Sequence, residues 1–500
     1  MGRFSIRRHA LRPMMAGLMM AQVVGTLFLW QSNLRLQQQV AAVEAAGWLA
    51  VPAGPAAAGL DSVATALGGG LFFTLTVGAG LALVTWAALY TWCWVLGRSR
   101  LVLGVWAILW LSGLAALNSR GFALWPSLFG VGVPLVTALA ALQPTATSPV
   151  GPPRRWWVAP LVMVLLAGLW VGRLDGEAFI TVRDQLLLNN RIGRQVNDFY
   201  YRYTLYAAEA FKAPAQKSWL TWRPAPQTTQ VVGAPMIRLL ARADLLAVEQ
   251  GPVDVTLNWP DARHIVILAG GKSIEVQRAA FMADPGRWLR TLSAATDRYA
   301  PFRRLTFAAL LVGFPGLLFL VVHGAIGRLV RLLGRAPGAA PWSAGGGCLV
   351  LGVLLFVPVL AGRAAPMEAD ALAAALGSGQ WRSRVAALRQ AEARGLDITG
   401  FAAYPDLLRS DRVVERYWLA RALAHGRDGS AHNDLLTLIR DAHPNVVCQA
   451  YYALGRRGDR AAIAPILSQM IGSDHWYTQW YGYRALKELG WHQNRSPSAR

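Results

Sequence analysis

Long apolar runs alternate with short polar loops over much of the chain, and seven of these runs contain no Asp, Glu, Lys or Arg. A helix that crosses the hydrocarbon core of a bilayer, roughly 30 Å thick, needs about 20 mostly apolar residues. A charged residue at its centre would cost on the order of 2.5–3.5 kcal/mol on insertion scales. The runs that predict transmembrane helices are 13–30, 70–97, 101–117, 121–142, 156–172, 305–327 and 343–362.

The basic residues of the short loops are distributed unevenly between the two sides of these predicted helices. One side holds Arg3, Arg7, Arg8, Arg12, Arg98, Arg100, Arg154, Arg155, Arg328, Arg331 and Arg335, and the other holds Arg35 and Arg120. Because short basic loops stay in the cytoplasm, this excess predicts a cytoplasmic N-terminus, and the seven crossings set the side of the later segments. Residues 173–304 and 363–500 would then lie in the periplasm of a bacterial inner membrane. One helix more or fewer would move the C-terminal region to the cytoplasm.

The first apolar run follows a basic stretch, as in a secretory signal peptide, but no small-residue cleavage site follows it, so we expect a retained anchor. Residues 34–51 are too short and too polar for another crossing. Leu36, Val40 and Val43 recur at helical spacing beside three glutamines. This spacing predicts a short helix on the outer membrane surface.

The large loop at 173–304 has mixed polarity and is long enough for a small extramembrane domain. Its first part, 177–211, reads as helical, and Phe199, Tyr203 and Tyr206 fall on one face of that helix. One interpretation is an aromatic surface for a partner or for lipid headgroups. The other is a face that packs on the rest of the loop or on the membrane.

The remainder of this loop predicts a small α+β module. Residues 217–231, rich in Pro, Thr and Gln, are interpreted as a linker. Alternating apolar and polar positions predict strands at 253–259, 264–268 and 273–277. Gly270 and Gly271 supply a hairpin turn between the last two strands. Asp284 precedes a proline and opens a helix at about 285–296.

A repeated motif occupies about the last quarter of the chain. Its Ala-Leu pairs begin at Ala387, Ala422, Ala453 and Ala485. In the fullest copy, Asp441 opens a turn before one helix, and Gly458-Asp459 starts the next. This segment resembles the short bacterial HEAT repeats, of the type also found in phycobilisome-lyase-like proteins. The resemblance implies an α-solenoid over 363–500 with a protein-binding concave face, and it implies no lyase chemistry. Such helix pairs must stack to bury their narrow apolar stripes.

The last helix of this segment carries an unusual side. A terminal repeat needs a polar outer face for solubility. Here one side carries Trp476, Trp480, Tyr483 and Lys487. Trp and Tyr are common interface anchors, so we expect this side to dock on the rest of the chain or on a partner. The alternative is plain internal core.

Together these segments predict an α-helical polytopic membrane protein with about seven transmembrane helices, a small α+β extramembrane domain and a C-terminal HEAT-like solenoid. The composition agrees, because 54% of residues are hydrophobic and only 15% are charged. Soluble domains carry about 25% charged residues. The net charge of +22 lies largely in loops between apolar runs, so we expect no nucleic-acid partner.

Motifs for chemistry are missing from the sequence. Cys93, Cys348 and Cys448 form neither a disulfide framework nor a metal-binding spacing. The one metal site that could be assembled, from His432, His443 and Cys448, has no recognised spacing. We therefore expect no cofactor and no metal, and nothing in the sequence favours an enzyme.

Three functions fit these observations. The first is a bacterial inner-membrane anchoring or scaffold protein, which uses the lipid bilayer as support and presents the solenoid to a protein partner in the periplasm. The second is a transporter or lipid-handling component, with the solenoid as a regulatory domain. The third is a membrane enzyme that uses the polar run of Asn189, Asn190, Arg191, Asn197 and Asp198. Such a run is otherwise the surface of a helix.

Overall fold

The computed structural model describes residues 4–6, 11–144, 157–172, 175–226, 228, 233–333, 340–361, 367–426 and 429–495. Six of the arginines that predicted the orientation lie outside these residues: Arg3, Arg7, Arg8, Arg154, Arg155 and Arg335.

Six helices among the described residues are long and apolar enough to cross a membrane. They are α1 (Leu11–Ala45), the run of α3 (Val63–Phe73), the π-helix η1 (Thr74–Gly78) and α4 (Ala79–Trp94), then α5 (Arg100–Leu117), α6 (Leu124–Ala141), α13 (Ala300–Leu332) and α14 (Ala340–Ala361). A seventh span exists if α7 (Val158–Val171) and the helical stretch Gly176–Leu188, bent by 107° relative to it, are counted as one. The seven crossings therefore stay a prediction.

The outer part of the first helix differs from the prediction. The structure has no separate surface helix near 34–51, because α1 continues without a break from Leu11 to Ala45. The junction at residues 31–35 contains neither Gly nor Pro, so nothing there ends the helix. Its polar side chains are also used: Gln39 is buried and donates a hydrogen bond to the Thr221 hydroxyl at 3.3 Å. A short helix, α2 (Gly54–Ala57), follows the turn.

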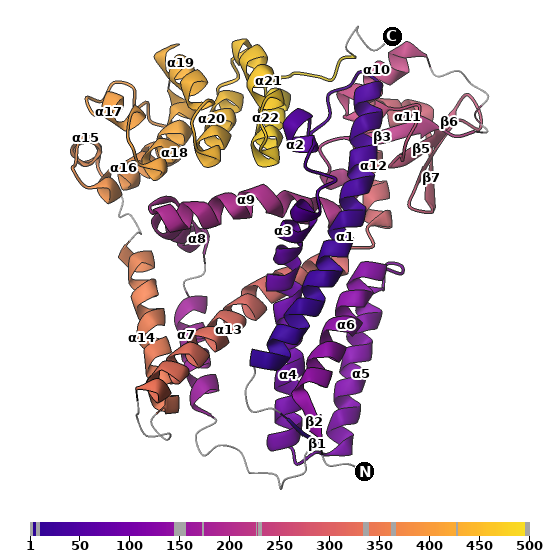
Figure 1. Ribbon diagram of the computed structural model, residues 1–500. Coiled ribbons are helices and arrows are strands. Elements are labelled where there is room, and N and C mark those ends of the chain that lie inside the picture. The colour runs from indigo at the N-terminus through magenta and orange to yellow at the C-terminus, as the bar shows by residue number, and fades with distance from the viewer. Residues whose placement is uncertain are drawn as a thin grey trace.

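The apolar helices form a bundle in which α1 packs on α3 and α6, and α13 packs on α4 and α14 (Figure 1). Four phenylalanines, Phe28, Phe73, Phe129 and Phe302, fill its centre. Helices α7 and α14 pack on each other beside the lower part of α13. A two-stranded pairing of β1 (Phe4–Ile6) with β2 (Leu142–Pro144) lies at the N-terminal end of the bundle.

The α+β module contains one five-stranded sheet with the order β4-β3-β5-β6-β7. Its strands are β3 (Leu220–Pro224), β4 (Leu245–Ala247), β5 (Val255–Asn258), β6 (His264–Ala269) and β7 (Lys272–Gln277). Its helices are η3 (Pro214–Gln216), α10 (Ala234–Arg242), α11 (Arg278–Ala283) and α12 (Pro285–Thr296). The predicted hairpin is confirmed, since β6 and β7 pair antiparallel around Gly270 and Gly271. The helix at 285–296 is confirmed too, because Asp284 accepts a hydrogen bond from the Arg287 backbone at 2.9 Å.

The interpretation of residues 217–231 as a linker is wrong in its first half. Strand β3 lies there and pairs in parallel with both β4 and β5. Its residues Leu220, Thr221 and Trp222 are buried. The flanking Pro, Thr and Gln residues resemble a linker in composition, but three successive buried positions are typical of a strand covered on both faces.

The C-terminal region is a stack of helix pairs, which confirms the solenoid. The inner row consists of α16 (Trp381–Arg394), α18 (Val413–Ala422), α20 (Pro444–Arg457) and α22 (Trp476–Glu488), each of which contacts the next. The remaining helices are α15 (Ala369–Leu376), α17 (Tyr404–Leu408), η4 (Leu423–His425), α19 (Gly429–Leu438), η5 (Arg460–Ala462) and α21 (Ile463–Ile471). Of these, α17, α19 and α21 form the outer row in Figure 1.

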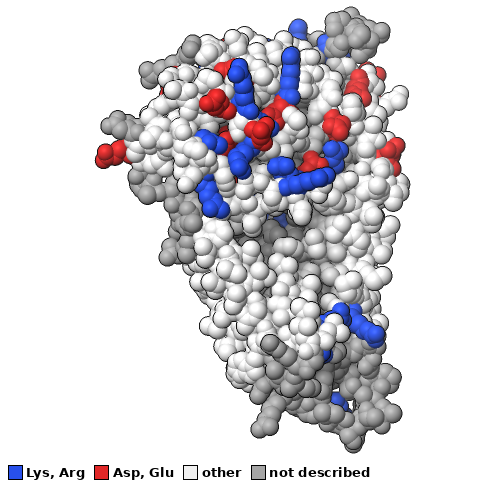
Figure 2. All heavy atoms as spheres, turned by 60° about the vertical axis from the view of Figure 1, so that its left-hand side comes forward, with Lys and Arg blue, Asp and Glu red and all other residues white. Residues whose placement is uncertain are grey.

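The solenoid and the sheet lie at the same end of the helical bundle, opposite the N-terminus (Figure 1). Charged side chains follow this division. Figure 2 shows mixed acidic and basic residues on the upper part of the visible face, a broad uncharged band below them, and Lys or Arg alone at the lower end.

Candidate functional site

A helical segment of this chain packs against the inner row of the solenoid. It consists of α8 (Gly176–Val182), η2 (Arg183–Leu188) and α9 (Arg191–Phe211). In Figure 1 it lies between the solenoid and the bundle. Asp175 begins α8 by accepting a hydrogen bond from the Ala178 backbone at 2.8 Å, and Asn190 begins α9 by accepting one from Gly193 at 2.7 Å. A Cβ at Gly193 would lie 1.9 Å from the Leu186 carbonyl oxygen, so this close turn requires glycine.

A buried ion pair within η2 makes hydrogen bonds to two aromatic side chains of α18. The carboxylate of Asp184 accepts hydrogen bonds from Arg183 Nε at 2.9 Å and from the indole nitrogen of Trp418 at 2.7 Å. Arg183 also donates to the Tyr417 hydroxyl at 2.7 Å, and its guanidinium lies 4.1 Å from the centre of that ring. Burial raises the pKa of Asp184, while the guanidinium and the indole act to lower it. These contacts hold η2 against the second inner helix.

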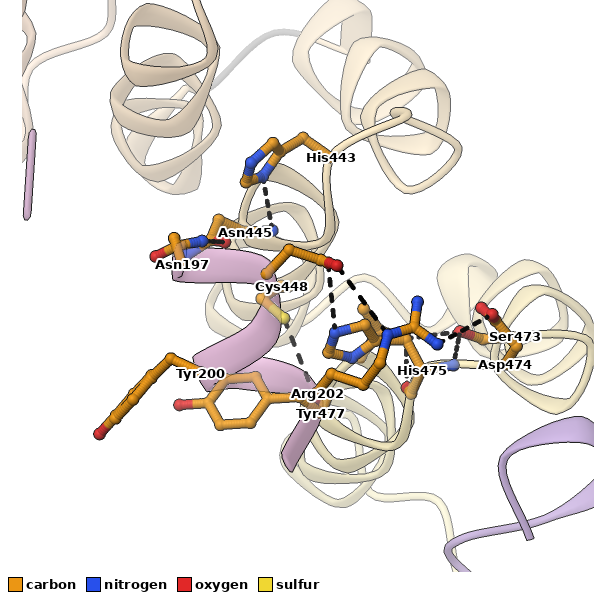
Figure 3. A network of polar contacts seen from close by, with 12 residues as sticks. Asn197, Tyr200, Arg202, His443, Asn445, Cys448, Ser473, Asp474, His475 and Tyr477 are labelled. Carbon is orange, nitrogen blue, oxygen red and sulfur yellow. Dashed lines mark hydrogen bonds and ion pairs between the residues drawn. The ribbon is translucent and has the colours of Figure 1, made fainter. Parts of the chain in front are cut away.

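A second contact joins α9 to α20 (Figure 3). The buried side chain of Asn197 donates from Nδ2 to Asn445 Oδ1 at 2.7 Å. Asn445 lies in the first turn of α20, where its backbone N–H donates to His443 Nδ1 at 3.3 Å. Burial lowers the pKa of His443 to about 4, so its ring is neutral at pH 7 and can accept this bond.

A third contact joins α9 to the start of α22. Arg202 lies 3.5 Å from Asp474 and 3.9 Å from Asp198 on its own helix (Figure 3). His475 Nε2 lies 4.0 Å from the carboxylate of Asp198. Burial, followed by the charge of Arg202, lowers the pKa of His475. A neutral imidazole suits this place, because neither of its ring nitrogens has a hydrogen-bond partner among the described residues.

The predicted aromatic side of the last helix packs on this chain itself. Trp476 is buried against Tyr206 of α9, with ring centres 4.9 Å apart, which joins two residues that the sequence had singled out separately. Tyr483 donates from its hydroxyl to Asp244 Oδ1 at 2.6 Å, and Lys487 Nζ lies 3.0 Å from the same oxygen. Docking on the chain was one of the two predicted outcomes for this side.

The other predicted residues are less enclosed. Trp480 is half-buried, with the Arg484 guanidinium 4.9 Å from its ring centre. Phe199 and Tyr203 have ring centres 4.7 Å apart, and Phe199 is exposed. The face predicted for α9 is thus split between Tyr206, which is covered by the solenoid, and Phe199, which is open. Binding of a partner at any of these residues stays a prediction.

Two glutamines complete the attachment and were not predicted. Gln479 accepts a hydrogen bond from the Ala53 backbone N–H at 2.8 Å and donates to its carbonyl at 3.0 Å. Gln493 makes the same pair of bonds with Leu49, at 3.1 and 2.8 Å. Each amide therefore serves as a backbone mimic for the segment that follows α1. Glutamine side chains are usually exposed, so the sequence carries no signal for this role.

The polar run proposed for an enzyme takes part in structural contacts. Asn189 accepts from Arg412 at 3.2 Å, Asn190 caps α9, and Asn197 and Asp198 contact the solenoid as described above. Arg191 is exposed.

The three residues of the conceivable metal site are also used separately. His432 Nδ1 lies 3.1 Å from Asp459, and the Cys448 thiol donates to the Tyr477 carbonyl at 3.9 Å. The described residues include no group of three or more His, Cys, Asp or Glu that could hold a metal ion.

Trp476 and Trp480 also border a cavity of about 10 Å³ between α1, α9 and α22. That volume is near the minimum for a single water molecule. These indole rings therefore serve to attach the solenoid, and they do not enclose a ligand-sized space.

The comparison with protein families agrees with the repeats seen in the structure. A family profile described as HEAT repeats matches residues 405–494, which run from α17 through α22. No curated protein and no solved structure matches the chain. The C-terminal segment therefore carries HEAT repeats, which form a helical solenoid of a kind that generally mediates protein–protein interaction.

Proposed function

We propose that this protein is a membrane-anchored scaffold that presents its solenoid and its α+β module on the periplasmic side of a bacterial inner membrane, where it recruits another envelope protein. The observation that carries this proposal is the attachment of the HEAT repeats to the helical bundle through α8, η2, α9 and the segment 49–53. Solenoids bind proteins along extended surfaces. A fixed attachment would hold that surface in one orientation relative to the bilayer.

The outer row of the solenoid is the surface left for such a partner. The inner row is covered by α8, η2 and α9, so a partner that used it would have to displace them. On α19 and α21, Asn433, Ser468 and Ile471 are exposed, and Arg440 is exposed just after α19. We therefore assign partner binding to the outer row.

The membrane part of the proposal is supported by the distribution of charge. Apolar side chains are exposed along α5, α13 and α14, as expected for helices that face lipid. Arg98, Arg100, Arg328 and Arg331 lie in or beside the α4–α5 and α13–α14 connections, at the end of the bundle opposite the solenoid. Basic loops at that end favour a cytoplasmic location for it.

Photocrosslinking in intact cells tests the recruiting role. A photoreactive residue at Asn433 or Arg440, on the outer row, should give a defined adduct with one envelope protein. The same residue at Glu275, which is exposed on β7, is the matched control. Identical adducts from the two surfaces, or none from the outer row, would contradict the proposal.

Sidedness needs a separate measurement. Alkaline phosphatase fused after Arg500 should be active, because that enzyme folds only after export. A fluorescent fusion that is bright in the cytoplasm and a phosphatase fusion that is inactive would place the solenoid inside, and the envelope role would be lost.

One observation favours lipid handling as a second candidate. A cavity of about 280 Å³ lies between α4, α5, α6 and α13, with an almost entirely apolar lining. Its residues are Leu81, Trp110, Gly113, Leu114, Ala116, Leu117, Gly130, Pro301 and Leu305. If it holds a lipid chain in transit, Gly113→Phe should slow the transfer of fluorescent lipid between reconstituted vesicles. Gly324→Phe, on an open part of α13, is the control, and unchanged transfer in both variants would remove this function.

A further inference from the structure

Helix α9 has a second face that nothing in the described structure covers. Ile192 is 74% exposed, Val196 55%, Phe199 45% and Tyr200 53%. Spacings of three and four residues place them along one side of the helix. Asn197, which bonds the solenoid, lies on the other side, and Tyr200 points away from the network of Figure 3. The helix is therefore bound through a polar face while its apolar face is open.

Both ends of this helical segment are fixed at one level of the bundle. At one end, Gln185 of η2 donates to the Pro358 carbonyl of α14 at 3.2 Å. At the other end, Tyr203 packs against Gly68 of α3 so closely that a Cβ there would lie 2.8 Å from its ring. Pro358 lies near the end of the predicted span 343–362, and Gly68 just precedes the span 70–97. Figure 1 shows this segment lying across the bundle beneath the solenoid. That is the level at which the predicted spans would meet the aqueous side.

Depth and chemistry together identify what covers the open face. An amphipathic helix at this depth buries apolar side chains at the boundary between headgroups and acyl chains. Phe and Tyr rings suit that boundary, and the aliphatic Ile192 and Val196 are the most exposed side chains of the stripe. Arg191 and Gln195 are exposed beside the stripe and can remain among the headgroups.

We infer that α9 is an interfacial helix whose exposed stripe of Ile192, Val196, Phe199 and Tyr200 rests in the outer leaflet. The solenoid is then held at the bilayer surface by a helix with lipid on one face and HEAT repeats on the other. This inference rests on the proposed membrane anchoring.

Site-directed fluorescence quenching in the full chain tests it. Single cysteines replace Val196, Leu109 in the middle of α5, and Ile471 on the outer row, all exposed apolar positions. Cys93 and Cys348 are changed to Ala, and the buried Cys448 is left. Each cysteine carries an environment-sensitive fluorophore in vesicles of phosphatidylcholine and phosphatidylglycerol. Spin-labelled lipids and aqueous iodide serve as quenchers.

The inference expects quenching at position 196 by a spin label near the headgroup, at position 109 by one near the chain end, and at position 471 by iodide alone. If position 109 escapes lipid quenching, the membrane anchoring itself fails. If position 109 is quenched by lipid while position 196 is quenched by iodide, the stripe faces water and the inference is overturned. Protection of position 196 from both quenchers would overturn it as well, because a protein would then cover the stripe. Phe199→Cys repeats the measurement one turn further along.

Discussion

Two interfaces of this molecule are built in opposite ways. In the bundle, α4 and α13 touch through residues without side chains, since a Cβ at Gly313 would lie 2.6 Å from the backbone of Gly80. Between α9 and the solenoid, long polar side chains make the contact, as in the bond of Asn197 to Asn445 at 2.7 Å. The first interface depends on backbone approach, and the second on paired donors and acceptors.

The difference matches the surroundings proposed for each interface. Lipid chains are as apolar as leucine, so helices in a bilayer gain little from hiding apolar surface and depend on close packing of small residues. At the aqueous end, a buried polar group that finds no hydrogen-bond partner destabilises the folded state. A network such as Arg183, Asp184 and Trp418 therefore specifies one arrangement of solenoid and bundle.

Removing the carboxylate at the centre of the polar interface should have the largest effect. Asp184→Ala leaves the Arg183 guanidinium and the Trp418 indole N–H buried without their acceptor. Breaking a buried pair by removing one partner costs about 3–5 kcal/mol. We expect the solenoid to separate from η2, measured as faster hydrogen exchange in α18 and faster proteolysis before α15. Asp411→Ala, at an exposed position of the solenoid, should change neither. Equal protection in both variants would mean that the Asp184 carboxylate does not hold η2 on α18.

Acid should weaken the same interface through His443. Burial lowers its pKa from 6.5 to about 4, while Asp441 and Asp198 act to raise it and Arg194 and Arg416 to lower it. The released side chain binds a proton at a pH at which the docked one does not. Stability is therefore greatest above pH 6.5 and falls as the pH decreases toward 4, by about 3 kcal/mol at most.

The matched variant for this effect is His443→Asn, which keeps a side-chain acceptor at the start of α20 but does not titrate in this range. The protection of α20 amides, expressed relative to their intrinsic exchange rate at each pH, should fall between pH 7 and 4.5 in the unaltered protein. It should fall less in the variant. The same slope in both proteins would assign the pH dependence to other groups, such as His475.

The predictable parts of the fold are those with a local signal. The HEAT repeats were evident from Ala453-Leu-Gly and Gly458-Asp459, because each helix pair repeats the same short-range contacts. Strand β3 was missed because its neighbours β4 and β5 are distant in sequence, and only the assembled sheet buries Leu220 and Trp222. The length of α1 was missed because its polar half is stabilised by residues such as Thr221, which arrive much later in the chain.

The candidate site was predictable in composition but not in its pairing. The aromatic residues of α9 and α22 stood out because they share one side of each helix. That Tyr206 meets Trp476 depends on how the solenoid stacks above α9, which no spacing records. Gln479 and Gln493 gave no signal, because their role follows from the position of the segment 49–53 relative to the last repeat.

The glycine interface should respond to added volume. Gly313→Val introduces side-chain atoms where a Cβ alone would lie 2.6 Å from the backbone of Gly80. Overpacking typically costs about 1–3 kcal/mol. We expect a lower melting temperature in detergent. Gly324→Val, on the same helix with open space around it, is the control and should melt like the unaltered protein. If both variants melt alike, the close approach of α4 and α13 does not stabilise the bundle.

The smallest expected effect tests whether a polar bond at the edge of the solenoid contributes at all. Tyr483→Phe removes the hydrogen bond to Asp244 at 2.6 Å and the one from Gln493 Nε2 at 3.2 Å, but leaves Lys487 beside the Asp244 carboxylate at 3.0 Å. The net loss should be about 1 kcal/mol, because the remaining cation keeps the acceptor paired. Hydrogen exchange of β4, which directly follows Asp244, should accelerate accordingly. The matched change is Tyr451→Phe, since the Tyr451 hydroxyl is buried with no hydrogen-bond partner among the described residues. That variant should be neutral or slightly stabilised, so an equal change in the two would show that the hydrogen bond to Asp244 contributes no measurable stability.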